Sequence, residues 1–369
     1  MLEQEILKTI NKYNLIESGD KIVLGVSGGP DSICMLNILN KIKKDLKFDI
    51  VVAHINHGIR ENAKYDEEFV KKICEKMEIK CFILHAKVKE IAEKEKRGIE
   101  EAGRIVRYNF FNEIMYKTNS NKIAIAHNAN DNAETIIMNT IRGSGTNGLK
   151  GIDVKNGVYI RPLIKIKRED IENYCKENNL KPRHDESNDE NIYTRNKIRN
   201  IAIPYIKSEL NPNIIDTLNR LSDIAKEELE YIKIQTQKEY EEICLYENIL
   251  VKDVYNKEDK SKITLDTQKE YKYVTNNIYN ELENLIDNKE SEFIILNLKK
   301  FNEEHITIQK RIILYSINKL FGSTKGIEKI HIDDIIKLCN NNIGNKFLIP
   351  NKKIKIVIKN KKIYIIAKK

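Results

Sequence analysis

Lys21–Asn40 reads KIVLGVSGGPDSICMLNILN, and this stretch decides the fold of the first half of the chain. Its first part, 22–26, is a short, mostly apolar run rich in β-branched residues, which predicts a buried strand. From Ile33 onward, apolar residues recur at the spacing of an amphipathic helix. A turn with two glycines, SGGPDS at 27–32, joins the strand to the helix.

This turn has the properties of an anion-binding site. Gly28 and Gly29 let the backbone bend and approach a ligand closely. The free N–H groups at the start of the following helix attract an anion, and the helix dipole adds to the attraction. Ser27 and Ser32 can add hydroxyl donors, and Asp31 can bind a magnesium ion that bridges phosphates. The competing interpretation is an ordinary glycine-rich turn, since the stretch matches neither GxxxxGK[ST] nor GxGxxG.

Length and composition are those of a globular protein with two or three domains. The chain has 369 residues, of which 41% are hydrophobic and 32% charged. No apolar run approaches the roughly 20 residues of a membrane span, and the N-terminus lacks the apolar core of a signal peptide. We therefore expect a cytoplasmic protein without membrane contact.

Cysteine spacing and net charge bear on which metal sites, disulfides and binding partners the protein can have. The six cysteines are scattered without a C-x-x-C pair, which argues against a zinc ribbon, a cysteine-held cluster or a disulfide framework. The net charge of +9 is compatible with a polyanionic partner. Lysine is common throughout the chain, so background usage explains the charge equally well.

Strand and helix patterns alternate through the first half. Such alternation predicts parallel βαβ units with helices on both faces of a doubly wound sheet. After the opening unit, strands are expected at 48–54, 80–85, 122–127 and 158–162, and helices at 63–77, 99–116 and 131–141. Polar clusters follow three of the strands, at 27–32, 54–57 and 127–131. Because ligands bind beyond the carboxyl ends of such strands, these clusters predict one shared site.

The second half is predicted to be a mostly helical linker followed by a smaller α+β domain. We place the boundary near residue 209, giving domains 1–209 and 210–369, with a long helix at 214–243. Short strands are expected at 249–254, 263–266 and 293–298, helices at 273–285, 306–321 and 332–340, and an antiparallel sheet at 347–366. No catalytic pattern appears after about residue 200, so this half is interpreted as a recognition module.

Two segments before the boundary are candidate binding elements. Residues 142–151, RGSGTNGLKG, carry four glycines; they predict a mobile loop that closes over a substrate, or a plain surface linker. A helix at 193–206 would present Arg195 and Arg199 on one face at i, i+4. Two such arginines can grip a phosphate or a carboxylate, or belong to a solvated helix face.

Seven ordered motifs resemble those of the bacterial tRNA(Ile)-lysidine synthases, a family of N-type ATP pyrophosphatases with a HUP-like PP-loop domain. The motifs are SGGPDS at 27–32, HINHGIR at 54–60, EAGRIVRYNFF at 101–111, HNANDNAET at 127–135, RGSG and GLKG within 142–151, RPL at 161–163, and DESN with RNKIR within 185–199. Asn132 stands where the family usually has Gln, Gly103 where Ala is common, and His184 where an aromatic residue is frequent. Larger members carry a second appended domain, which this chain is expected to lack.

The resemblance implies a two-step reaction. ATP adenylates the C2 carbonyl oxygen of the wobble cytidine in the CAU anticodon of a minor isoleucine tRNA, and pyrophosphate leaves. The ε-amine of free L-lysine then attacks C2 and expels AMP, which changes codon and charging specificity from methionine to isoleucine. ATP and Mg²⁺ are the implied cofactors, and tRNA(Ile) is the implied partner. The sequence leaves open whether the protein forms a homodimer.

The resemblance also assigns residues. Gly28 and Gly29 N–H groups would hold the leaving pyrophosphate, Asp131 and Glu134 would orient or deprotonate the lysine ammonium, and arginines would stabilise phosphate or the flipped base. The catalytic candidates are Asp31, Arg107, Asp131 and Glu134; the nucleotide-binding candidates are Ser27, Gly28, Gly29, Pro30, Asp31, Ser32, His54 and Asn56; the substrate-binding candidates are His127, Arg142, Arg195 and Arg199. Asp31 is the expected magnesium ligand. Zinc at His54, His57 and His127 is disfavoured, because nucleotide contacts suit strand ends better.

Three other functions remain as alternatives. A PP-loop tRNA thiolase needs a reactive cysteine near the site, and no C-x-x-C exists. An amidotransferase-type synthetase needs an ammonia source, and no glutaminase motif is visible. A non-catalytic RNA- or nucleotide-binding module would not need the carboxylates of Asp31, Asp131 and Glu134.

Overall fold

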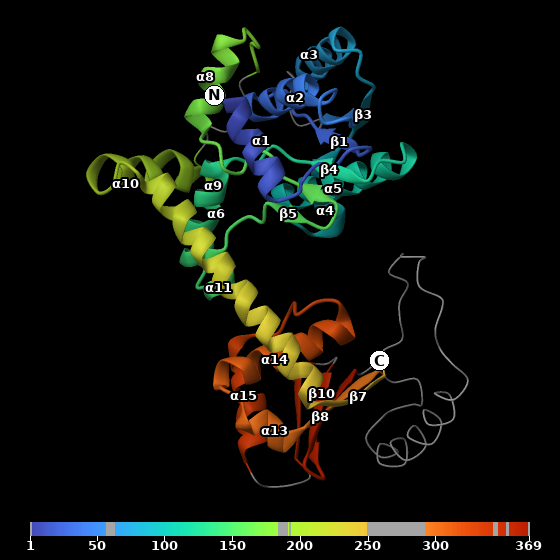
Figure 1. The fold of residues 1–369 in the computed structure, drawn as a ribbon, viewed down its shortest axis with the longest axis vertical. Coiled ribbons are helices and arrows are strands. Elements are labelled where there is room, and N and C mark those ends of the chain that lie inside the picture. The colour runs from blue at the N-terminus through green and yellow to red at the C-terminus, as the bar shows by residue number, and fades with distance from the viewer. Residues whose placement is uncertain are drawn as a thin grey trace. The chain divides into compact units, whose positions relative to one another are not determined.

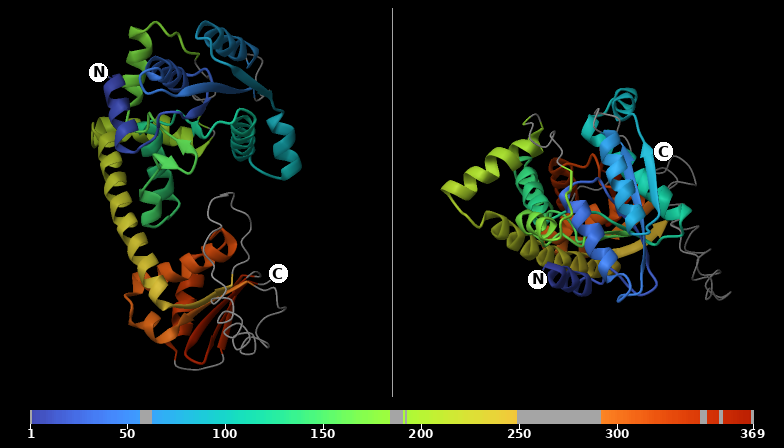
Figure 2. Two further views of the ribbon diagram at one scale, coloured as in Figure 1. Left: turned by 45° about the vertical axis from the view of Figure 1, so that its right-hand side comes forward. Right: turned by 90° about the horizontal axis from the view of Figure 1, so that it is seen from above.

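The computed structural model describes residues 2–56, 63–183, 191, 193–248, 292–341, 346–351 and 354–367 (Figure 1). The chain divides into two compact units, Met1–Glu227 and Glu228–Lys369. The division lies within one continuous helix, α11 (Ile214–Ile243), drawn in yellow in Figure 2. The boundary proposed from the sequence, near residue 209, precedes this helix, and the roles assigned to the two domains stay predictions.

The first unit is built on a six-stranded sheet in the order β3-β2-β1-β4-β6-β5. All neighbouring strands are parallel except β5, which pairs antiparallel with β6 at one edge. The strands are β1 (Lys21–Gly25), β2 (Asp49–Asn56), β3 (Cys81–His85), β4 (Lys122–Ala124), β5 (Lys155–Asn156) and β6 (Tyr159–Ile160). Strand order reverses at β1, with β2 on one side and β4 on the other, so the loop after β1 lies at the switch point where such sheets bind ligands.

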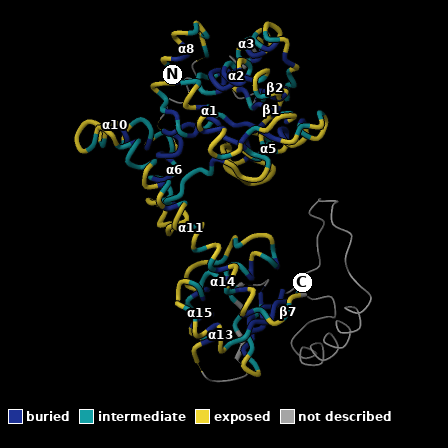
Figure 3. Tube along the Cα trace, viewed as in Figure 1, coloured by how far each residue is buried: buried dark blue, intermediate teal, exposed yellow. Residues whose placement is uncertain are grey.

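Helices cover both faces of this sheet, as the alternation of patterns predicted. Ile22 and Leu24 of β1 point into a core that also contains residues of the first helices, whereas Val23 packs with Phe110 and Phe111 on the opposite face. The buried stretches are drawn dark blue in Figure 3. The helices are α1 (Leu2–Lys12), α2 (Pro30–Ile42), α3 (Ala63–Lys76), α4 (Val88–Glu95), α5 (Ile99–Lys117), α6 (Ala129–Ile141), α7 (Thr146–Leu149), α8 (Arg168–Glu177), α9 (Thr194–Lys197) and α10 (Ile203–Glu209).

Three local features differ from the sequence-based expectation. The helix α4 was not predicted, because its eight residues are mostly charged. The glycine-rich loop 142–151 contains the one-turn helix α7. The helix expected at 193–206 is three consecutive segments, since a π-helical stretch, η2 (Ile198–Ala202), separates α9 from α10.

The glycine-rich loop 142–151 packs against α6, and a side chain at Gly151 would clash with Asn132 of that helix. Gly151 has φ +61°, and a Cβ there would fall inside van der Waals contact of Asn132 Oδ1. That oxygen accepts a hydrogen bond from the Ile152 N–H at 2.6 Å. Gly151→Ala therefore combines backbone strain of about 1–2 kcal/mol with crowding of about 1–3 kcal/mol, so denaturant unfolding should give a free energy about 2–5 kcal/mol lower.

Gly157 provides the matched control for that substitution. It has φ +57°, but nothing lies within 4 Å of the position that an added methyl group would take. Gly157→Ala should lose only the backbone share, about 1–2 kcal/mol. Equal losses for the two variants would contradict a tight contact between Gly151 and Asn132.

The second unit has an antiparallel five-stranded sheet in the order β7-β8-β11-β10-β9. Three helices pack their apolar residues on it in a separate core, which confirms the predicted α+β character. The strands are β7 (Cys244–Asn248), β8 (Phe293–Asn297), β9 (Lys346–Asn351), β10 (Ile354–Lys359) and β11 (Lys362–Ala367), and the helices are α13 (Leu298–Glu303), α14 (Ile306–Phe321) and α15 (Lys329–Asn340). The elements expected at 249–254, 263–266 and 273–285 lie outside the described residues. Within the described ranges, none of the helices is long and apolar enough to cross a membrane.

Candidate active site

The turn after β1 is held together by its own hydroxyl groups. Gly28 has φ +97°, a conformation that favours glycine, and Gly29 is the N-cap of α2 with Pro30 at the first helical position. Ser32 Oγ accepts hydrogen bonds from the Ser27 and Gly28 N–H groups at 3.2 Å each and donates to the Gly29 carbonyl at 3.0 Å. The two N–H contacts to Ser32 lie at the long end of the normal hydrogen-bond range.

Two acidic residues from distant parts of the chain are joined by Asn128. The Asn128 side chain donates to Asp31 Oδ1 at 2.9 Å, and its carbonyl oxygen accepts from the Asp131 N–H at 3.0 Å. The Asn128 N–H donates in return to Asp131 Oδ2 at 3.0 Å, which completes a capping box at the start of α6. Burial, and then the negative charge of Asp131, raise the pKa of Asp31 to about 6.

Asp131 and Glu134 form a four-charge network with the two predicted arginines. Arg195 donates to Glu134 Oε2 at 2.8 Å and to Asp131 Oδ1 at 3.1 Å. Arg199 donates to Glu134 Oε1 at 2.6 Å and Oε2 at 2.9 Å, and to Asp131 Oδ1 at 3.0 Å. Glu134 is only 1% exposed. The two arginines thus bind carboxylates of the protein itself, and the substrate contacts expected for them stay predictions.

His127 is a neutral acceptor among cations. Arg161 Nε donates to His127 Nδ1 at 3.2 Å, so the ring proton belongs on Nε2. Burial first, and then the charges of Arg161, Arg195 and Arg107, lower the pKa of His127 to about 4. Arg107 itself is exposed. The charge of Arg195 acts on both residues, and the charge of Asp131 acts on His127, so His127 and Arg107 lie close to the same charged groups.

The lowered pKa of His127 predicts a loss of stability in acid. The unfolded chain binds a proton at the ordinary histidine pKa near 6.5, whereas the folded chain resists until about 4. Stability from this residue is therefore complete above pH 6.5 and falls between 6.5 and 4, by up to roughly 3 kcal/mol. His127→Asn should flatten this part of the curve in chemical denaturation between pH 7 and 4. An unchanged slope would contradict a neutral, half-buried imidazole.

His54 and Asn56 end β2 beside the loop, but each already has a protein partner. The His54 ring is 2% exposed, and its Nδ1 donates to the Val26 carbonyl at 2.8 Å. Burial lowers the pKa of His54, so the ring is neutral. Asn56 donates to Glu67 Oε2 at 3.1 Å. The direct nucleotide contacts expected for these two residues stay predictions.

Arg142 lies at the opposite end of α6 from Asp131. It is exposed and follows the C-terminal end of α6, whereas Asp131 lies in the first turn. Eleven residues of helix separate the two by roughly 16 Å. His57 and the DESN motif at 185–188 lie outside the described residues.

Sequence reasoning gave no role to two residues that complete the site. Asn128 lies within the cluster 127–131 but was interpreted only as part of it, and Arg161 was quoted only as part of the RPL motif. The N-cap position of Asn128 was recoverable, because Asn followed three residues later by an acidic residue is a capping signal. Its contact with Asp31 was not, because 97 residues separate the two.

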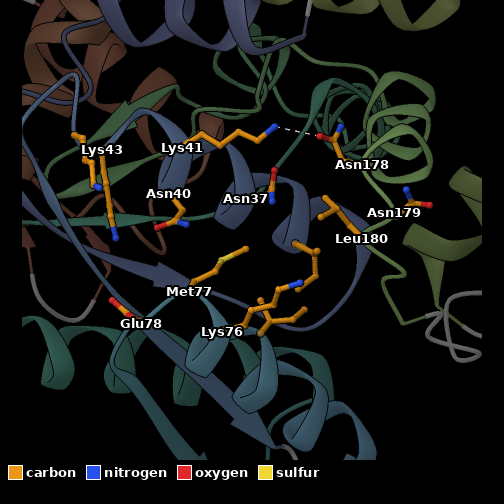
Figure 4. A pocket seen from close by; sticks show the side chains of 13 residues that line it. Asn37, Asn40, Lys41, Lys43, Lys76, Met77, Glu78, Asn178, Asn179 and Leu180 are labelled. Carbon is orange, nitrogen blue, oxygen red and sulfur yellow. Dashed lines mark hydrogen bonds between the residues drawn. The ribbon is translucent and has the colours of Figure 1, made fainter.

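A separate groove of about 700 Å³ lies at the other end of α2 (Figure 4). Lys41 crosses its upper rim and donates to Asn178 Oδ1 at 3.1 Å. The groove is lined near the C-terminal ends of α2, α3 and α8, where Lys43, Lys44 and Lys76 complement the helix dipoles. It is therefore distinct from the Asp31 site at the N-terminal end of α2.

The residues around Asp31 fit a magnesium ion. Mg²⁺ prefers carboxylate and other oxygen ligands. Asp31 carries a pKa raised by burial and by the charge of Asp131, and a nearby divalent cation would relieve this repulsion. In the described ranges, this site included, no group of three or more His, Cys, Asp or Glu side chains is arranged to hold a metal ion, so Asp31 would bind the ion together with the phosphates of the nucleotide.

Comparison with known proteins agrees with this architecture. The PP-loop domain family model matches residues 1–206. A tRNA(Ile)-lysidine synthase of Clostridioides difficile is 40% identical over 350 residues, covering 94% of this chain and 67% of the relative. That of Clostridium tetani is 37% identical, covering 94% and 65%. The chain thus spans about two thirds of the length of these curated relatives.

Among solved structures, the U34-tRNA thiolase NcsA of Methanococcus maripaludis, with its [4Fe-4S] cluster, superposes with a TM-score of 0.50 at 22% identity, covering 61% of this chain and 78% of that one. This likeness concerns the fold alone. Identity to the synthases extends over nearly the whole chain and includes both units. The chain therefore belongs to the tRNA(Ile)-lysidine synthase family of PP-loop proteins.

Proposed function

We propose that the protein ligates lysine to C2 of the wobble cytidine in the CAU anticodon of a minor isoleucine tRNA. ATP is converted to AMP and pyrophosphate in the reaction. The modified base pairs with A instead of G, so that the tRNA reads an isoleucine codon and is charged with isoleucine. Since tRNA, ATP and free lysine are its substrates, we expect the reaction to take place in the cytoplasm.

One observation carries this proposal. Carboxylates from the first turns of two helices that follow neighbouring parallel strands, Asp31 in α2 after β1 and Asp131 in α6 after β4, are joined by Asn128 at the switch point of the sheet. A phosphate-binding turn beside a second acidic centre suits a reaction that first transfers AMP and then brings in a cationic amine. The matches to the synthases support the same assignment.

In the first step the C2 oxygen attacks the α-phosphorus, and the bond to the β-phosphate oxygen breaks. The residues act mainly by position and charge, as is usual in phosphoryl transfer. In this proposal N–H groups of Gly28 and Gly29 receive the leaving pyrophosphate, and Arg107, an exposed cation, would stabilise the developing negative charge. Asp31 holds the magnesium ion, which supplies charge neutralisation when bound.

In the second step the ε-amine of lysine attacks C2, and AMP leaves with the former base oxygen. The amine must first lose a proton, and it loses another after the C–N bond forms. Asp131 and Glu134 attract the ammonium and orient it. In the structure these carboxylates pair with two guanidinium groups. The lysine ammonium therefore displaces the guanidinium group of Arg195 or Arg199. The N–H donors of the displaced arginine then become available to phosphate.

Pyrophosphate release tests the proposal. Purified protein with ATP, Mg²⁺, lysine and the CAU isoleucine transcript should release pyrophosphate and consume lysine in equal amounts, and it should release little without tRNA. Glutamine or a sulfur donor in place of lysine should yield no stable product. Turnover with a sulfur donor and not with lysine would instead identify a PP-loop tRNA thiolase, the runner-up function. Light scattering of the same sample separates a monomer from a homodimer.

A further inference from the structure

Asn128 lies within the motif at 127–135, but the resemblance assigned it no role in the reaction. It is 2% exposed, and its side chain and N–H make three hydrogen bonds to two carboxyl-bearing residues. Asp31 lies in the first turn of α2, and Asp131 lies in the first turn of α6. Asn128 thus links the phosphate-binding turn to the acidic centre at Asp131.

The network fixes the orientation of the Asn128 amide. Because its oxygen accepts the Asp131 N–H, its nitrogen must face Asp31, to which it donates at 2.9 Å. A donor held in place by the helix cap restrains the Asp31 side chain through this hydrogen bond. A carboxylate ordered in advance loses less side-chain entropy when it binds a cation.

We propose that Asn128 is a positioning residue that holds Asp31 for the magnesium ion of the bound nucleotide. The inference rests on the proposed function only for the identity of that nucleotide, ATP. Asn128 does not touch the reacting atoms in this proposal; it acts through Asp31. The same side chain caps α6, so a test must separate the cap from the contact with Asp31.

Asn128→Ser makes that separation. Serine is as good an N-cap as asparagine, but its short hydroxyl lacks the amide donor that reaches Asp31. Asn297→Ser is the matched control, since Asn297 caps α13 in the second unit by accepting from the Lys300 N–H at 3.1 Å. Both variants should unfold at nearly the wild-type denaturant midpoint.

Binding of a non-hydrolysable ATP analogue, measured by calorimetry without tRNA or lysine, is the readout. With Mg²⁺ the Kd should rise about tenfold in Asn128→Ser, which corresponds to about 1.4 kcal/mol, and stay unchanged in Asn297→Ser. With a chelator in place of Mg²⁺ the two variants and the wild type should bind equally. A merely structural role would weaken binding under both conditions.

A double-mutant cycle completes the test. In an Asp31→Ala background, Asn128→Ser should change the Mg²⁺-dependent Kd by less than about twofold, because the partner of the amide is gone. The inference would be overturned if Asn128→Ser raised the Kd tenfold in the Asp31→Ala background as well, or if it left the Kd unchanged in the protein that retains Asp31. Since no tRNA is present, these results hold even if lysine transfer itself is not observed, so the two failures are distinguishable.

Discussion

Asp131→Asn is expected to abolish lysine transfer, with a fall in turnover of about 1000-fold, while tRNA affinity stays within about twofold of the wild type. The change keeps the side-chain shape and leaves an oxygen to accept the Asn128 N–H, but it removes the charge that faces Arg195, Arg199 and the incoming ammonium. Lysine consumption under saturating ATP and filter binding of labelled tRNA measure the two effects.

Asp216→Asn is the matched control for this substitution. Asp216 pairs with Lys167 at 2.7 Å, and both side chains are substantially exposed. Removing an exposed pair changes little, so this variant should transfer lysine at the wild-type rate. A loss of tRNA affinity in Asp131→Asn as large as its loss of activity would count against a role in lysine recognition.

Glu134→Gln is expected to give the largest loss of stability, about 3–5 kcal/mol. Glu134 is 1% exposed and accepts three hydrogen bonds from Arg195 and Arg199. In Glu134→Gln, Asp131 is the one carboxylate of this network that still pairs with the two guanidinium groups. A buried charge without its partner is far more costly than the loss of the pair as a whole.

A second substitution tests that explanation. In a Glu134→Gln, Arg195→Met double variant, one cation and one carboxylate remain, and stability should return by at least about 1 kcal/mol relative to Glu134→Gln. Denaturant unfolding measures both proteins. A loss below about 1 kcal/mol in the single variant, or a further loss in the double variant, would contradict the four-charge network.

Local patterns predicted most of the fold. The stretch 21–40 carries its strand, turn and helix in contiguous residues, and the helices at 214–243 and 306–321 were predicted with the bounds observed. The shared site followed from a geometric rule, because polar clusters after parallel strands must meet at one edge. The π-helical break at 198–202 has no comparable local signal.

Pairings across the sequence were harder to predict. Arg195 and Arg199 contact the same two carboxylates, as neighbours on one face would, although they lie in different segments, α9 and η2. These carboxylates lie more than 60 residues away in the sequence. The i, i+4 spacing of the two arginines could not show whether they bind a phosphate or the carboxylates of Asp131 and Glu134. Arg142 is the opposite case, since its distance from Asp131 follows from helix length alone once α6 is recognised.

The most direct test of lysine transfer is nucleoside mass spectrometry of the CAU isoleucine tRNA after incubation with the protein, ATP, Mg²⁺ and isotopically labelled lysine. We predict that the wobble cytidine gains the mass of the labelled lysine less one water, and that Asp31→Ala abolishes the gain. An unmodified cytidine with the folded wild-type protein, or a sulfur-containing nucleoside when a sulfur donor is supplied, would contradict this prediction.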